Sequence, residues 1–509
     1  MKKLREKIAL NPIMTFIILI AITILVSGFL NLIHFGATYN TIDSGSGNYV
    51  TQTEHVESLL NLSGVKYIFS NTVINFATFA PLIMLIIILF GIGVMEKSGF
   101  LKTVITILTK NSKKTTITFI LVLICIISSI GGDLGYIVFI PLSALLFLHG
   151  KRNPLIGIIT AFAALTAGNG LSILFSSIDS TLTSSTLLGA SLLDSSYTIG
   201  IWSFLFIMSV AVIITAIAIT KITENIIAPK MSKYEFPDEE EKEITRKEIR
   251  GLILGLGAGA IYLFIIIYSM IPGLPLSGSL LDNNQVLYID KLFSNESFFS
   301  NGYVFIVTIL FVIWGFFYGL GARTIKTNND IASSLGHSLD GIGKPIVLIF
   351  FAATFIAIFK KTNIGTVITA NFANIISESA FQGIPLIILL FVLAAISTIF
   401  LPSPVARWAI ISPVAVPVMM NAGISPEFTQ TIFKFSEAIF LGLTPLLAYF
   451  VIYLAYMEKY NQEENPITMF RSIKYQAYYS FAIGGLLLLL LIIWYMIGVP
   501  IGVGGSAVL

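Results

Sequence analysis

Hydrophobic residues in this chain form long uninterrupted runs, separated by short polar or charged segments. The first run extends from Pro12 to about Ile33 and follows a basic start, Met1-Lys-Lys-Leu-Arg-Glu-Lys. A cleavable signal peptide has an apolar core of only about 7 to 15 residues, so this run is expected to be a retained membrane helix. Further apolar runs occupy residues 67–95, 115–148, 154–190, 197–221, 251–272, 302–321, 345–360, 386–420, 427–458 and 471–497.

The run 115–148 is too long for a single crossing. It would measure about 51 Å as one helix, against a hydrocarbon core of about 30 Å. Basic residues flank it on both sides, so the positive-inside rule places both of its ends in the cytoplasm. The pattern predicts a re-entrant hairpin with its tip at Gly131, Gly132 and Asp133, where glycine permits a sharp turn.

The run 386–420 is interrupted at its middle by Pro402 and Pro404, which flank Ser403. Proline lacks a backbone donor and clashes with the preceding turn, so two prolines this close together break a helix. The sequence therefore predicts a second re-entrant hairpin, with its tip at these prolines.

The remaining runs predict nine membrane crossings, with a cytoplasmic N-terminus and an external C-terminus. Segments 34–66 and 273–301 then lie outside, and the charged segment 229–250 lies inside. Lys360 and Lys361 fall on the outer side in this arrangement, against the usual bias of basic residues toward the cytoplasm.

The two halves of the chain carry related motifs in the same order. Thr103-Val-Ile-Thr106 recurs at Thr366-Val-Ile-Thr369, and Ile127-Ser-Ser-Ile130 is matched by Ile396-Ser-Thr-Ile399. The halves would enter the membrane from opposite sides, which is typical of the inverted repeats of secondary transporters. The expected fold is an all-α polytopic membrane protein with about nine transmembrane helices and two re-entrant hairpins in two inverted repeats. The expected segments are 1–66 (first helix and outer loop), 67–228 (first repeat), 229–301 (cytoplasmic loop, one helix and outer loop) and 302–509 (second repeat).

The composition supports a membrane protein and excludes other classes. Hydrophobic residues make up 56% of the 509 residues and charged residues 11%, against about 25% charged residues in an ordinary globular chain. A net charge of +3 provides no basic face for nucleic acid, and a single cysteine, Cys125, excludes a disulfide scaffold. No Walker A, HExxH or CxxC pattern occurs, so we expect no enzyme and no cofactor, with a Na+ or H+ gradient as the energy source.

Each predicted hairpin is followed by an apolar run that small or polar residues interrupt. These interruptions are Thr166-Ala-Gly-Asn-Gly-Leu-Ser172 and Ser436-Glu-Ala-Ile-Phe-Leu-Gly-Leu-Thr-Pro445. An unwound segment at membrane depth frees carbonyls for a cation and directs half-helix N-termini at an anionic group. We expect the two segments to form a transport site; the alternative is that they only kink packed helices.

Carboxylates near these interruptions are candidates for ion coupling. Burying Asp179 after the first break costs several kcal/mol unless a cation, a proton or a partner compensates, or unless it only caps a helix. Glu437 lies in the second break with Lys434 three residues earlier, so the two could neutralise each other or bind a substrate or proton. Neutral oxygens of the kind that ligate sodium come from Asn169, Ser172 and Thr398. A sodium site formed by Asp179, Asn169 and Thr398 is one expected arrangement.

Arg407 follows the tip of the second predicted hairpin. Its guanidinium could hold a substrate carboxylate through two hydrogen bonds, or it could anchor the hairpin at the outer interface. Trp408 beside it could stack on a substrate or lie in the protein core.

Three segments of the chain resemble the AbgT family of p-aminobenzoyl-glutamate transporters, and the likeness covers nearly the whole chain. The segments are Asn75-Phe-Ala-Thr-Phe-Ala-Pro-Leu82 running to Gly91-Ile-Gly-Val-Met-Glu-Lys-Ser-Gly99, Gly131-Gly-Asp133, and Arg407-Trp-Ala-Ile-Ile-Ser-Pro-Val-Ala-Val-Pro417. The resemblance implies a homodimer in the bacterial inner membrane, with nine crossings, two hairpins and inverted repeats. It also implies cation-coupled movement of p-aminobenzoyl-glutamate, a small carboxylate substrate, or export of sulfonamide antimetabolites.

The resemblance also implies roles for individual positions. The family's aspartate after the first break, its tryptophan after the second tip and its proline in the second break match Asp179, Trp408 and Pro445. The chain departs from the family's pattern at Thr398 and Ser172 (for asparagine), Val405 (for serine), Glu437 (for aspartate) and Lys434 (for arginine). A glutamate with fewer amide oxygens around it could favour a proton over sodium. Substrate contacts are expected from Trp408, Arg407, Lys434, Ser403 and Pro445. Ion coupling is expected from Asp179, Glu437, Asn169, Ser172 and Thr398.

Two rival functions remain open. The same fold could carry a dicarboxylate or a short-chain fatty acid, and a protein of another class, an ion channel, would show voltage-dependent conductance without saturable exchange. A membrane enzyme is disfavoured, because no nucleophile, base and orienting group recur at a recognisable spacing.

Overall fold

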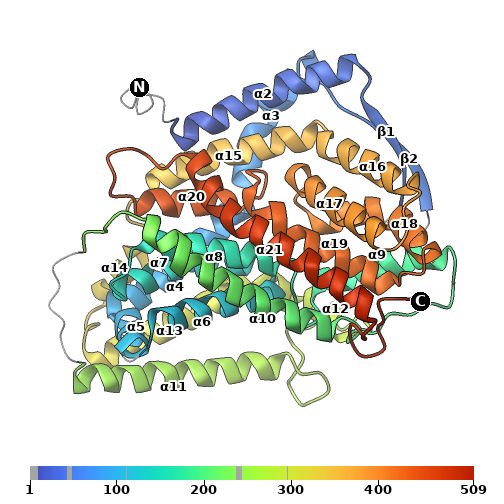
Figure 1. Cartoon of the computed structure of the whole chain (residues 1–509). Helices are drawn as coiled ribbons and strands as arrows, with labels where there is room; N and C mark the ends of the chain where they lie inside the picture. Colours follow the sequence, from blue (N-terminus) through green and yellow to red (C-terminus); the bar gives the residue numbers. More distant parts are fainter. Residues whose placement is uncertain (1–9, 43–48, 111, 237–243, 295) are drawn as a thin grey trace.

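A computed structural model of the chain describes residues 10–42, 49–110, 112–236, 244–294 and 296–509. The basic N-terminus and residues 237–243 of the charged segment 229–250 lie outside these ranges. The described residues form helices throughout, apart from one antiparallel β-hairpin and the connecting loops (Figure 1). Eight helices in this part of the chain are long and apolar enough to cross a membrane, which agrees with a polytopic membrane protein.

The first half of the chain carries an entry helix, a long helix in two pieces, a short helix, a hairpin, a broken helix and a further crossing. Its helices are α2 (Pro12–Leu32), α3 (Leu62–Ala77), α4 (Ala80–Ser98), α5 (Phe100–Lys110), α6 (Lys114–Ile127), α7 (Leu134–His149), α8 (Pro154–Gly168), α9 (Ser177–Ser191) and α10 (Leu205–Ile222).

After a connecting unit of four helices in the described residues, the second half repeats the later part of this order: a long helix, a short helix, a hairpin, a broken helix and a further crossing. The connecting unit holds α11 (Arg246–Ser269), α12 (Tyr288–Phe293), α13 (Phe298–Ala322) and α14 (Asn328–His337). The repeated elements are α15 (Gly343–Lys361), α16 (Ile364–Ser377), α17 (Ile384–Phe400), α18 (Pro404–Asn421), α19 (Pro426–Phe440), α20 (Phe450–Lys459) and α21 (Met469–Ile497).

Both predicted hairpins are present. Helices α6 and α7 are joined by a short 3-10 turn, Ser128–Gly131, and by Gly132, whose positive φ of 60° favours glycine. Helices α17 and α18 are separated by Leu401, Pro402 and Ser403, and the Ser403 hydroxyl accepts a hydrogen bond from the Ala406 amide at the start of α18. The glycine and proline positions therefore locate both tips correctly.

The two halves run in opposite directions, as an inverted repeat requires. Asn153 caps the start of α8, and its side-chain amide donates to the Ser232 carbonyl oxygen. Ser425 caps the start of α19, and its hydroxyl donates to the Ser506 carbonyl oxygen. Ser232 belongs to the connection that leads to α11, and Ser506 lies three residues before the C-terminus. The start of α11 and the C-terminus lie at opposite ends of the molecule (Figure 1).

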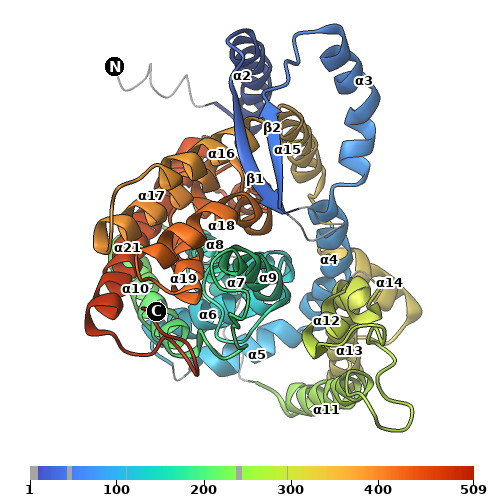
Figure 2. The same cartoon turned by 90° about the vertical axis from the view of Figure 1, so that its right-hand side faces the viewer.

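Two antiparallel β-strands lie within the segment 34–66, which the hydrophobic pattern predicts only as an outer loop. Strands β1 (Gly36–Ile42) and β2 (Tyr49–His55) are rich in threonine and tyrosine, which suit extended backbone. The hairpin lies along α16 and α18 (Figure 2), and the Asn374 side-chain amide donates to the Thr38 carbonyl oxygen. Lys361 pairs with Glu57 at 2.5 Å on the same side, so the carboxylate of this segment compensates for a lysine against the charge bias.

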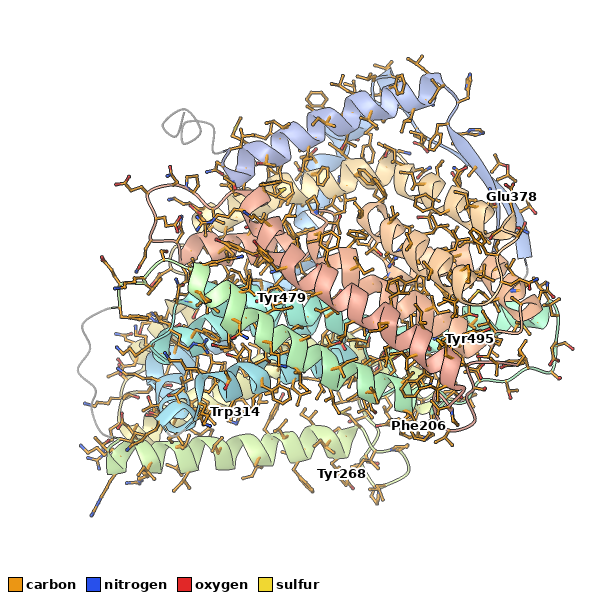
Figure 3. All side chains as sticks on the ribbon, viewed as in Figure 1. Phe206, Tyr268, Trp314, Glu378, Tyr479 and Tyr495 are labelled. Carbon is orange, nitrogen blue, oxygen red and sulfur yellow. The ribbon has the colours of Figure 1, made fainter. Side chains whose placement is uncertain are left out.

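Helices α4, α11 and α13 pack together beside the hairpins and broken helices (Figure 2). Small residues permit this contact, because a Cβ on Gly321 of α13 would lie 2.6 Å from the Gly251 Cα of α11. Helix α11 carries exposed apolar side chains, among them Phe264, which is 69% exposed. Figure 3 shows side chains of this helix projecting away from the rest of the molecule. Such a face suits contact with lipid.

Candidate functional site

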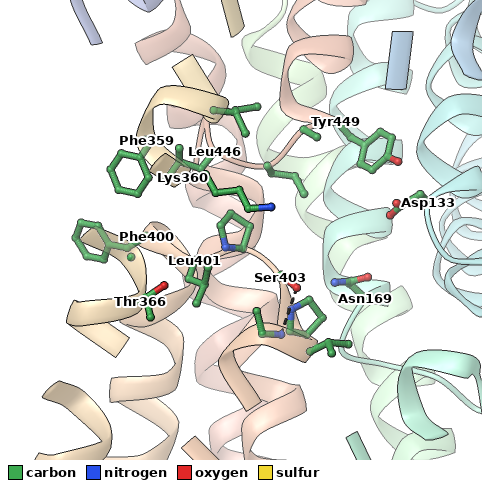
Figure 4. A pocket seen from close by; sticks show the side chains of 18 of the residues that line it. Asp133, Asn169, Phe359, Lys360, Thr366, Phe400, Leu401, Ser403, Leu446 and Tyr449 are labelled. Carbon is green, nitrogen blue, oxygen red and sulfur yellow. Dashed lines mark hydrogen bonds between the residues drawn. The ribbon is translucent and has the colours of Figure 1, made fainter. Parts of the chain in front are cut away.

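A cavity of about 680 Å³ lies between the two halves of the chain. Both hairpin tips, both broken segments and the junction between α15 and α16 contribute to its wall (Figure 4). Its lining is mainly apolar, which is usual for small-molecule sites. The lining residues are Asp133, Tyr136, Asn169, Ile178, Ile356, Phe359, Lys360, Asn363, Gly365, Thr366, Phe400, Leu401, Pro402, Ser403, Pro404, Val405, Ala406, Ile410, Leu446, Leu447, Ala448 and Tyr449.

Two charged residues face this cavity from different elements. Asp133 precedes α7 at the first tip, but its side chain makes no capping hydrogen bond with that helix. Its carboxylate points toward the Tyr449 hydroxyl, whereas Lys360 extends from the end of α15 into the space between the walls (Figure 4). The cavity therefore presents one anionic and one cationic group within an otherwise neutral wall.

Asp179 and Lys434 form a buried ion pair that joins the two halves. Asp179 is the third residue of α9, where one of its oxygens accepts hydrogen bonds from the Ser176 amide and hydroxyl at 2.9 and 2.7 Å. Ser172 also donates to Asp179 at 2.7 Å and accepts from Lys434 at 2.8 Å. Asp179 thus caps its helix and compensates for the lysine charge at the same time.

Arg407 and Glu437 form a second buried ion pair, between α18 and α19. Arg407 also donates to Thr398 at 2.6 Å and to the Ala394 carbonyl oxygen at 3.0 Å. One oxygen of Glu437, Oε2, has no hydrogen-bond partner among the described residues. This buried oxygen can therefore bind a proton or accept a hydrogen bond from another donor.

Trp408 is completely buried behind the second tip. Its indole nitrogen donates to the Thr186 hydroxyl at 2.9 Å and to the Leu182 carbonyl oxygen at 3.1 Å, both on α9. Its ring lies 4.5 Å from that of Phe433, between centroids. These contacts connect the second hairpin to the helix that carries Asp179.

The ion pairs lie directly behind the cavity wall. Asn169 lines the cavity, and a Cβ on the next residue, Gly170, would overlap the Lys434 carbonyl oxygen and lie 3.4 Å from Glu437 Cβ. Glycine is therefore required at this point of the first broken segment, where the chain touches the backbone of α19.

The structure separates the residues predicted from the sequence into two groups. Those at the cavity wall are Asn169, Ser403, Asp133, Pro402 and Pro404. Those behind it, or in the broken segments outside the lining, are Asp179, Ser172, Lys434, Arg407, Glu437, Thr398, Trp408 and Pro445. Gly131 and Gly132 form the first turn without lining the cavity.

Two details of the predicted arrangement differ from what the structure shows. Lys434 and Glu437 do not neutralise each other: Lys434 pairs with Asp179 and Glu437 with Arg407. The three residues of the expected sodium site face different partners, because Asp179 binds Lys434, Thr398 binds Arg407 and Asn169 lines the cavity. Within the described ranges, no group of three or more histidine, cysteine or acidic residues is arranged to hold a metal.

Sequence reasoning missed the contributions of Lys360 and Tyr449 to the cavity. Tyr449 gave no signal, since it lies in an ordinary apolar run. Lys360 did give one, because it is a lysine at the end of a membrane helix on the side where basic residues are uncommon. A basic residue on the side of the membrane where basic residues are uncommon is a candidate for a functional role.

Comparison with known proteins connects this arrangement to one family. A family model described as "AbgT putative transporter family" matches residues 3–509. The p-aminobenzoyl-glutamate transport protein of Escherichia coli (strain K12) is 26% identical over 503 residues, which cover 97% of this chain and 94% of that protein.

Two solved structures are also similar. The YdaH transporter of Alcanivorax borkumensis is 25% identical with a TM-score of 0.49, covering 97% of this chain and 100% of that one. MtrF of Neisseria gonorrhoeae, whose structure is described as illuminating a class of antimetabolite efflux pumps, is 28% identical with a TM-score of 0.49, covering 98% of each chain. Because the family model spans all but the first two residues, this chain belongs to the AbgT family of membrane transporters.

Proposed function

We propose that this protein is an ion-coupled secondary transporter of p-aminobenzoyl-glutamate-like, carboxylated aromatic compounds. The cavity between the two halves supports this proposal, because its volume, apolar walls and two opposed charges suit such a cargo. The relative named as a p-aminobenzoyl-glutamate transport protein supports the same cargo class. The bacterial inner membrane is the expected location, with a cytoplasmic N-terminus and no chemical conversion of the cargo.

A proton is the coupling ion that the charged groups favour. Among the described residues, Asp179 and Glu437 each have a cationic side chain as partner, so a sodium ion at either would have to displace it. A proton instead requires only an acceptor atom, and Glu437 Oε2 provides one in the buried region. Neutralising Glu437 would weaken its attraction for Arg407 and loosen α18 from α19.

Alternating access would use the contact between cavity and ion pairs. The α17–α18 hairpin carries both part of the cavity wall and Arg407. Substrate binding in the cavity and protonation of Glu437 would therefore both affect the position of this hairpin. The group α4, α11 and α13 would serve as the fixed scaffold against which the hairpins and broken helices move. A homodimer formed through a scaffold is the expected assembly, and light scattering of the detergent-solubilised protein would measure its mass.

Uptake into proteoliposomes tests the function and the ion together. Labelled p-aminobenzoyl-glutamate would be supplied under a proton gradient or a sodium gradient, each imposed alone. We expect saturable uptake driven by the proton gradient, and its loss in Asp179→Ala. Glu437→Gln keeps the side-chain size but removes the titratable group, so uptake in this variant should no longer respond to pH.

The alternatives give different results in the same assay. Uptake driven only by sodium, or an unchanged pH response in Glu437→Gln, would reject the proton at Glu437. Without uptake from folded protein, sulfonamides, dicarboxylates and short-chain fatty acids would be tested as the cargo. Voltage-dependent, non-saturating conductance would identify a channel.

A further inference from the structure

Lys360 differs from the other cationic side chains near the site in its lack of an ion-pair partner among the described residues. Lys434 and Arg407 are buried in ion pairs, and the neighbouring Lys361 pairs with Glu57 at 2.5 Å. In the part of the chain that the structure describes, Lys360 has no ion pair and lines the cavity, with its ammonium directed into the open space (Figure 4). Its three donors are therefore available to a ligand.

Asp133 on the facing wall has no ion-pair partner among the described residues; its carboxylate accepts a hydrogen bond from the Tyr449 hydroxyl and keeps further acceptor capacity. An aspartate at this position of a helix usually bonds to the first-turn amides, but Asp133 makes no such bond. It is the acidic residue of the cavity lining, and its carboxylate and the Tyr449 hydroxyl face the same space (Figure 4). A carboxylate beside a phenol forms an acceptor site for an N–H group.

The rest of the cavity lining is mainly apolar and suits a flat apolar body. Phe359, Phe400 and Leu446 contribute to the lining between the end of α15 and the broken segment before α20. Phe359 and Phe400 lie on the side of Lys360 away from Asp133 (Figure 4). A ligand that spans the two charges would thus place a carboxylate at Lys360, an N–H donor at Asp133 and its apolar or aromatic body against the apolar lining of the cavity.

We propose that Lys360 and Asp133 determine the specificity and the orientation of the cargo, with Lys360 binding its carboxylate and Asp133 its amine. This inference rests on the proposed function and extends it, because it identifies the side chains that bind the carboxylate end and the amine end of the substrate. It also predicts that the ion pairs behind the wall do not contact the cargo carboxylate directly. The lysine adds a charge-assisted hydrogen bond, which typically contributes about 10- to 100-fold in affinity.

The test measures binding of p-aminobenzoyl-glutamate to purified protein by calorimetry, together with transport in proteoliposomes. Lys360→Gln should raise Kd by about 10-fold or more, whereas Lys360→Arg should retain most of the affinity. Lys361→Gln is the matched control, because it removes the adjacent lysine outside the cavity lining, and it should bind like the wild type.

Ligand analogues assign each end of the cargo. The wild type should prefer p-aminobenzoyl-glutamate to its diamide, and Lys360→Gln should lose that preference. The wild type should also prefer p-aminobenzoyl-glutamate to benzoyl-glutamate, which lacks the amine, and Asp133→Asn should lose that second preference while keeping the first.

The outcomes distinguish this inference from the proposed function. If the wild type neither binds nor transports p-aminobenzoyl-glutamate, the cargo assignment fails. If the wild type transports it but Lys360→Gln and Lys361→Gln have equal Kd values and equal analogue preferences, the role of Lys360 is overturned. If Asp133→Asn, shown to melt like the wild type, retains the preference for the amine, the orientation is overturned.

Discussion

Arg407 and Glu437 are both fully buried, and among the described residues each has only the other as an ion-pair partner. A buried pair of this kind often contributes little net stability, because desolvation offsets the attraction, but removing one partner leaves an uncompensated charge. The pair is therefore better suited to coupling movement of α18 to a change of charge than to holding the fold together. The same reasoning applies to Asp179 and Lys434.

Arg407→Met should destabilise the protein by about 3 to 5 kcal/mol, because Glu437 would remain buried without compensation. The double variant Arg407→Met/Glu437→Leu should recover most of this loss, since neither charge of this pair is left. Thermal unfolding in detergent measures both. Lys361→Met breaks the exposed pair with Glu57 and should shift the midpoint little; equal midpoints for Arg407→Met and this control would contradict the argument.

At the scale of elements, the broken helices α8–α9 and α19–α20 depend on close backbone contact. Gly170 lies in the first break, where its missing side chain lets the chain approach the Lys434 carbonyl oxygen of α19. Gly131, in the turn of the first hairpin, has no positive φ, and a Cβ added there would meet no atom within 4 Å. Gly170 is therefore needed for close backbone packing, whereas Gly131 is not.

Gly170→Ala should abolish or strongly reduce transport and should cost about 1 to 3 kcal/mol of stability, because its Cβ would overlap a backbone atom that cannot rotate away. Gly131→Ala should behave like the wild type in both respects. Uptake and thermal unfolding of the two variants would be measured side by side. Normal transport by Gly170→Ala would show that the two broken segments separate easily.

At the scale of the whole molecule, α8 and α19 start at opposite ends, so the two halves have opposite orientations relative to each other. Which end faces the cytoplasm has to be measured. The charge bias predicts a cytoplasmic connection between α10 and α11 and an external connection between α11 and α12. Cys125 is the single cysteine of the chain and is buried, so a cysteine-free background is simple to make.

In a Cys125→Ser background, Lys233→Cys should react with an impermeant maleimide only after the cells are opened. Leu276→Cys, at a side chain that is 97% exposed, should react in intact cells. Labelling followed by gel shift measures both positions. The reverse pattern would invert the topology and place the N-terminus outside.

The sequence by itself determined the membrane class, most of the long apolar helices and both hairpin tips. These features depend on local properties, namely the length of apolar runs and the inability of Pro402 and Pro404 to continue a helix. It also located Asp179 and Glu437 as costly buried carboxylates. The sequence did not predict strands β1 and β2, because they are polar and half-exposed and depend on packing against α16 and α18.

Only the tertiary structure decided which charges pair and which remain available. Lys434 is three residues from Glu437 along α19, yet it binds Asp179, which is 255 residues away. Helices α9 and α18 both contact α19, so each charge on that helix meets a partner from another element. Lys360 faces the cavity for the same reason: its neighbours are set by how helices pack across the two halves, and that packing is not encoded in any local stretch of the chain.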